Sequence, residues 1–173
     1  MAAHIPDSID GKLLGLYLSD HLTGSTAGVS RIQRMAEAFA DTPVSADISR
    51  VSEEITRERA ELRALIHQLG LRQRPHRQAA AWVAEHVGRL KLNGRIVRRS
   101  PLTMVLEAEL MRAAVLGKLG GWQTLTELAP ELGLDPARFT ALADDARSQI
   151  EALSRVHEHA RSNAFRKSGD ISN

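Results

Sequence analysis

The sequence predicts an all-α fold, an up-down four-helix bundle with an additional short crossover helix. Ala, Leu, Glu and Arg dominate the composition, and these residues favour helix. Aromatic residues make up only 3% of the chain, and no stretch sustains the alternation of β-branched and polar residues that strands require. Four long stretches instead place apolar residues at steps of three and four, and a shorter stretch lies between the two pairs.

Capping residues and breakers set the expected boundaries of these elements. We expect residues 10–165 to form a single helical bundle domain, with a flexible N-terminus at 1–9 and a disordered tail at 166–173. The four long helices are expected at Asp10–Phe39, Ser45–Gly70, Pro101–Leu119 and Pro136–Phe165. Gly120 and Gly121 are expected to break the helix before them, with a short helical turn following at Trp122–Leu128. The crossover helix is expected at about residues 75–92, where Trp82, Val83 and Val87 would cover one side or end of the core.

Composition narrows the classes of function. The formal net charge is only +2, so the pI of about 9.4 does not indicate a strongly basic polyanion-binding protein. The absence of cysteine excludes disulfides and thiolate metal sites, and fits a cytoplasmic location. No stretch is apolar enough to indicate a membrane partner. Residues 124–142 have the cadence of a helix-turn-helix, but Asp144 and Asp145 on its second helix argue against nucleic acid as a partner.

One polar residue interrupts the apolar seam of each long helix. In the second helix Glu58 interrupts a seam formed by Ile48, Val51, Ile55, Leu62, Leu65 and Leu69. His21 interrupts the seam of the first helix, which runs from Leu14 to Phe39. Glu109 interrupts the seam expected for the helix at Pro101–Leu119, which is formed by Leu102, Leu106, Ala113 and Leu116. Gln149 interrupts the seam of the helix at Pro136–Phe165, which is formed by Phe139, Leu142, Ala146, Leu153, Val156 and Ala160.

A buried carboxylate costs several kcal/mol unless it is paired, protonated or bound to a cation. One interpretation is that His21, Glu58 and Glu109 converge on a divalent metal, with Asp20, Glu61 and Gln149 as neighbours. The other is that the polar groups satisfy one another, with a basic side chain as countercharge: Arg57, Arg112 or Lys118. A third interpretation is that the helical phase is wrong by one residue, which would leave some of these groups at the rim.

The chain resembles the ferritin-like superfamily, and within it uncharacterised actinobacterial ferritin-like bundles. The segments that carry this resemblance are "LYLSDHLTGSTAGVSRIQRMA", "EEITRERAELRALIHQLG" and "SPLTMVLEAELMRAAVLGKLGGWQTL". Di-iron proteins of this class carry a Glu on each of two helices and a Glu-x-x-His on each of the other two. This sequence contains no Glu-x-x-His, so the resemblance implies a degenerate di-metal site.

Three functions follow from these observations. The first is a non-catalytic structural or interaction role, for which we expect no catalytic residue and no cofactor. A second copy of the chain, in a homo-oligomer, is the partner that this role leaves open. The alternative is storage or redox work on Fe or Mn at a residual Glu/His site. A nucleic-acid-binding regulator is the second alternative.

Overall fold

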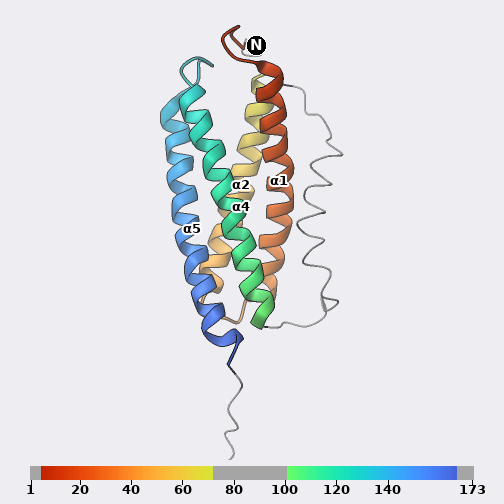
Figure 1. Ribbon diagram of the computed structural model, residues 1–173, viewed down its shortest axis with the longest axis vertical. Helices are drawn as coiled ribbons and strands as arrows, with labels where there is room; N and C mark the ends of the chain where they lie inside the picture. Colours follow the sequence, from red (N-terminus) through yellow and green to blue (C-terminus); the bar gives the residue numbers. More distant parts are fainter. Residues whose placement is uncertain (1–4, 72–100, 167–173) are drawn as a thin grey trace, which may run out of the picture.

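The protein is an all-α four-helix bundle, as the sequence predicts (Figure 1). The computed structural model describes residues 5–71 and 101–166. Within them the helices are α1 (Gly11–Ala38), α2 (Ser45–Gln68), α4 (Pro101–Leu128) and α5 (Pro136–Ala164). The predicted crossover helix at 75–92 and residues 167–173 of the predicted tail lie outside the described residues. None of the helices in the described part of the chain is long and apolar enough to span a membrane.

Each helix packs against two neighbours, in the cyclic order α1, α2, α5, α4 (Figure 1). Neighbouring helices are antiparallel, because side-chain partners run in opposite directions along them. On α1 and α4, for example, His21 lies beside Gly121 whereas Arg31 binds Glu107. The diagonal helices α2 and α4 are therefore parallel, and Leu71 and Pro101 lie at opposite ends of the bundle.

Local signals place the helix ends where the sequence predicts them, with one exception. The Asp10 carboxylate accepts hydrogen bonds from the backbone N–H groups of Lys12 and Leu13, which caps α1. Gly70 adopts a positive φ of 64° just beyond α2, a conformation that glycine reaches without a Cβ penalty. Asp135 caps α5 by accepting from Ala137. The exception is the C-terminal end of α4.

The prediction that Gly120 and Gly121 break α4 is wrong, because α4 continues through both glycines to Leu128. Two glycines in a helix interior cost about 1 kcal/mol each, so burial must offset that cost. Trp122 and Leu125 supply it, since both side chains are buried in the core. Gly121 also gives the His21 ring room, because a Cβ there would lie 3.1 Å from Cε1 of His21, a tight contact that the ring would have to relieve by moving. Gly121 marks a close approach of α1 to α4.

The core seams predicted for α2 and α5 are confirmed at every position. The seam predicted for α4 is wrong in phase: Leu102, Glu109 and Leu116 are exposed. The residues of α4 that face the core include Met104, Ala108, Met111, Val115, Trp122 and Leu125. The error has a physical origin, because α4 is apolar around most of its circumference and periodicity alone does not identify its inner face. The corrected spacing places Lys118, not Glu109, at the polar interruption.

Gly121→Val should lower the free energy of unfolding by about 1–3 kcal/mol, as overpacking of a filled site does. The cause is the His21 ring, so the loss should shrink in a His21→Ala background, as a double-mutant cycle measures in urea unfolding. Gln123→Val is the control for helix propensity, because Gln123 is exposed on the same helix. Equal losses for Gly121→Val with and without His21 would contradict the assignment.

Candidate functional site

Three polar side chains from three helices meet in the core, and we call Glu58, Lys118 and Gln149 the buried polar network. Glu58 of α2 is 1% exposed and Gln149 of α5 is fully buried. The Lys118 ammonium of α4 donates to Oε2 of Glu58 and to Oε1 of Gln149. The Gln149 amide donates to Oε1 of Glu58 at 2.7 Å, so both oxygens of the buried carboxylate are occupied. The three groups satisfy one another.

The buried polar network reaches the surface through α2. The Gln149 amide also donates to Oε2 of Glu54 at 3.0 Å. Oε1 of Glu54 in turn accepts from Nη1 of Arg50 at 2.8 Å. Each of the two acids therefore has a basic partner, Arg50 for Glu54 at the rim and Lys118 for Glu58 in the core, and the Gln149 amide joins the two pairs. Such pairing offsets the desolvation cost that each isolated charge would carry.

Two opposing effects act on the charge of Lys118. Burial lowers the pKa of its ammonium below the ordinary lysine value, and the neighbouring Glu58 carboxylate opposes that shift. Its side chain retains 17% exposure, whereas that of Glu58 retains only 1%. The ammonium thus lies at the edge of the core, with its stem along apolar side chains and its charge on Glu58 and Gln149.

Of the predicted metal ligands, only Glu58 belongs to this network. Glu109 lies on the exposed side of α4, where its carboxylate contacts Nε2 of His157 at 3.1 Å. It is nine residues, about 13 Å of helix, from Lys118. Among the residues that the structure describes, no three His, Asp or Glu side chains lie close enough together to hold a metal ion. The structure therefore does not bring His21, Glu58 and Glu109 together.

The predicted neighbours divide in the same way. Gln149 is a member of the buried polar network, but Glu61 forms an ion pair with Arg138 at 2.6 Å between α2 and α5. Asp20 is exposed on α1. Of the three basic residues considered as countercharge, Lys118 fills that role. Arg112 does not, and its Nε is buried without a hydrogen-bond partner among the described residues.

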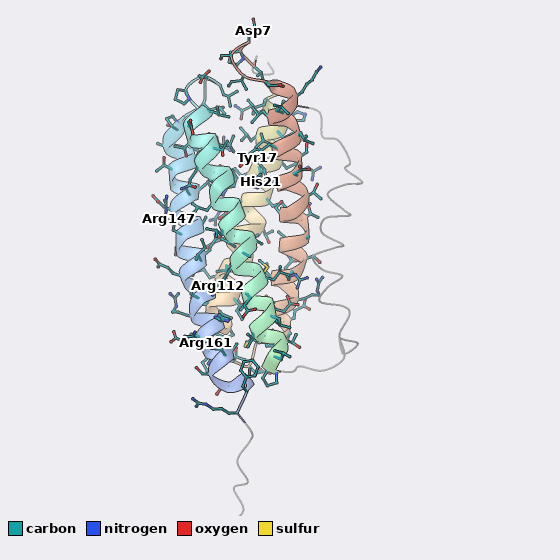
Figure 2. The ribbon with its side chains drawn as sticks, viewed as in Figure 1. Asp7, Tyr17, His21, Arg112, Arg147 and Arg161 are labelled. Carbon is teal, nitrogen blue, oxygen red and sulfur yellow. The ribbon has the colours of Figure 1, made fainter. Side chains whose placement is uncertain are left out.

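His21 lies half-buried on α1, apart from any ion pair in the described part of the bundle. Its ring packs edge-on against Tyr17, with ring centroids 4.5 Å apart, and Figure 2 shows the two residues one turn apart. Burial lowers the pKa of the His21 imidazole, and the negative charge of Asp20 opposes the shift. Neutral imidazole is the form that this apolar contact with Tyr17 and Gly121 favours.

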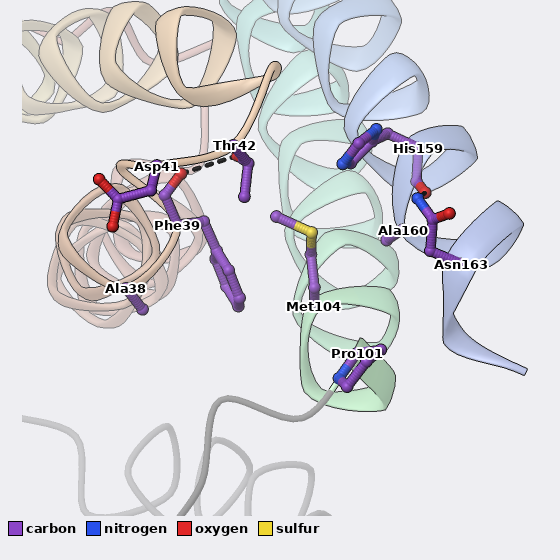
Figure 3. Close-up of a pocket in the computed structure, with 9 residues that line it drawn as sticks. All are labelled: Ala38, Phe39, Asp41, Thr42, Pro101, Met104, His159, Ala160 and Asn163. Atoms are coloured by element: carbon purple, nitrogen blue, oxygen red, sulfur yellow. Dashed lines mark hydrogen bonds between the residues drawn. The ribbon is translucent and has the colours of Figure 1, made fainter. Parts of the chain in front are cut away.

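A pocket of about 280 Å³ opens at the end of the bundle where α4 begins (Figure 3). Its walls include Phe39, Thr42, Met104 and His159, and the Thr42 hydroxyl donates to the carbonyl oxygen of Phe39 at 2.7 Å. None of the predicted site residues lines it. The pocket and the buried polar network are therefore separate features.

Comparison with protein-family models, with curated proteins and with solved structures finds no match to this chain. The class of the protein is defined by its own structure. It is an all-α four-helix bundle with a buried polar network of Glu58, Lys118 and Gln149.

Lys118→Met should lower the free energy of unfolding by roughly 3–5 kcal/mol at neutral pH, because it leaves the Glu58 carboxylate buried without its countercharge. Urea unfolding at neutral pH measures the loss. Lys12→Met, at an exposed lysine of α1, is the matched control. A loss equal to that control would show that Lys118 is not the countercharge.

His21 should make the protein less stable as the pH falls from about 7.5 to 5.5. Because its folded-state pKa lies below the ordinary 6.5, the unfolded chain takes up the proton first and unfolding becomes more favourable. The slope should end once the folded protein also binds the proton. His21→Gln should flatten this part of the profile, and His67→Gln, at an exposed position of α2, should not. An unchanged slope in His21→Gln would contradict a buried neutral imidazole.

Proposed function

We propose that this protein is a non-catalytic, ferritin-like bundle with a degenerate metal site, acting as a structural or interaction protein. The observation that carries the proposal is the contact between Lys118 and Glu58. In a carboxylate-bridged bundle a metal ion supplies the positive charge in the core. Here the ammonium of Lys118 supplies that charge to the one carboxylate buried in the described core.

The satisfaction of the buried polar network supports the same proposal. A working metal site needs carboxylate oxygens free to bind the ion and an open position for water or substrate. Both oxygens of Glu58 are engaged, one by Lys118 and one by Gln149. A metal ion would have to displace the ammonium and break the amide hydrogen bond.

Metal titration tests the proposal directly. Purified protein, with and without added Fe(II) or Mn(II), should retain less than one equivalent of metal after gel filtration, as elemental analysis measures. Glu58→Gln removes the charge of the only carboxylate buried among the described residues and should leave that result unchanged. One equivalent retained by the wild-type protein and lost in Glu58→Gln would overturn the proposal in favour of metal storage or redox function.

A triple substitution tests whether the buried polar network has a structural role alone. The protein with Glu58→Leu, Lys118→Met and Gln149→Leu together should remain a folded bundle. Its free energy of unfolding should equal that of the wild type or exceed it by up to about 4 kcal/mol. The reason is that well-packed apolar side chains avoid the desolvation cost of the charges. If the variant unfolds more readily than Lys118→Met alone, the network contributes more than mutual neutralisation, and the structural role as proposed fails.

A further inference from the structure

The pocket at the end of the bundle reaches the hydrophobic core. Three parts of the chain form its walls: the end of α1 with the turn after it, the start of α4, and the last turns of α5 (Figure 3). Phe39 and Met104, on two of these walls, are core residues that are only 9% and 5% exposed. The pocket therefore offers apolar side chains of the core to a molecule that enters from outside.

Small side chains leave the space that becomes the pocket. Ala160 continues the buried seam of α5 one turn beyond Val156, and Ala38 is the last residue of α1. Figure 3 shows the two alanines on opposite sides of the pocket. Neither side chain extends beyond its Cβ, and a volume of about 280 Å³ remains between the walls. Sites for drug-sized molecules measure roughly 300–1,000 Å³, so this pocket suits a smaller ligand.

The apolar walls favour an aromatic ligand. The ring of Phe39 can pack against another ring, either edge to face or offset and stacked. The thioether of Met104 is flexible and polarisable, so it adapts to a ligand and contacts aromatic rings favourably. Figure 3 shows both side chains directed toward the middle of the pocket.

One polar side chain of the pocket has hydrogen-bonding capacity left. His159 is half-buried, its ring makes no hydrogen bond or ion pair with the described residues, and Figure 3 shows the ring directed from α5 toward Thr42. The other polar side chains are engaged or turned away. The Thr42 hydroxyl donates to the Phe39 carbonyl, and the Asn163 amide donates to the backbone carbonyl of His159 at 3.1 Å. The Asp41 carboxylate points away from the pocket in Figure 3.

We propose that this pocket binds a small neutral aromatic molecule that carries one O–H or N–H group and is about the size of a phenol. Its ring packs against Phe39 and Met104, where it loses contact with water, and its polar group donates to the unprotonated nitrogen of the His159 ring. A charged ligand fits less well, because no described carboxylate or basic chain points into the pocket to offset its desolvation. The pocket is separate from the buried polar network, so this inference does not rest on the proposed function.

Fluorine NMR with para-fluorophenol as the probe tests the proposal. The probe resonance should shift or broaden with the wild-type protein and saturate with a dissociation constant of about 1 mM or below. His159→Phe removes the hydrogen-bond acceptor and should weaken binding about fivefold, the contribution of one hydrogen bond. His157→Phe, two residues away on α5 and outside the pocket, should leave binding unchanged. Absence of saturation in the millimolar range, or equal binding by the two histidine variants, would overturn the proposal.

A second matched pair tests whether the probe occupies the pocket itself. Ala38→Phe places a ring in the space between the walls and should abolish saturable binding. Ala40→Phe, at an exposed position two residues further along the chain, should bind the probe as the wild type does. Circular dichroism must show that each variant is folded, and if Ala38→Phe is not, the two histidine variants decide the question. Saturable binding that survives in folded Ala38→Phe would place the probe elsewhere and overturn the proposal.

Discussion

The pairing of Glu58 with Lys118 is the constraint on which the rest of the bundle depends. A carboxylate with 1% exposure has no water to neutralise it, so the core exists only in arrangements that bring a cation to it. Because α2, α4 and α5 each contribute one member of the buried polar network, the contact fixes the rotation and the height of three helices at once. A shift of one turn would move the ammonium by about 5.4 Å, out of hydrogen-bond reach. We infer that the network specifies helix register.

Helix α1 is held differently, because none of its side chains enters the network. Its buried residues lie towards its two ends, Leu14 and Leu18 at one and Ile32 and Met35 at the other. Between Ser19 and Ile32 no side chain of α1 is fully buried. In this stretch the His21 ring lies against Gly121 of α4. A steric fit of this kind fixes the distance between two helices, whereas the charge pair fixes register.

The sequence predicts three of the four seams because those helices are amphipathic, and it does not predict the seam of α4. In α2 and α5 one face is polar, so the apolar positions leave one solution. In α4, Leu102, Leu106, Ala113 and Leu116 form an apolar row as regular as the true seam, and only tertiary packing distinguishes the two. The signal that could have separated them is electrostatic: the phase that buries Met104, Met111 and Trp122 presents Lys118 to Glu58, whereas the other presents a second acid. The same argument accounts for Glu109, which has no role in the core.

The second apolar row of α4, formed by Leu102, Leu106, Ala113 and Leu116, needs its own explanation. A helix that is apolar on most sides is normally buried on most sides, yet among the described residues α4 packs only against α1 and α5. Leu102 and Leu116 of this row are therefore exposed on the described bundle, while the row of Met104, Met111 and Trp122 fills its core. The core row is selected by its partners on the other helices, because only that phase brings Lys118 to the buried Glu58.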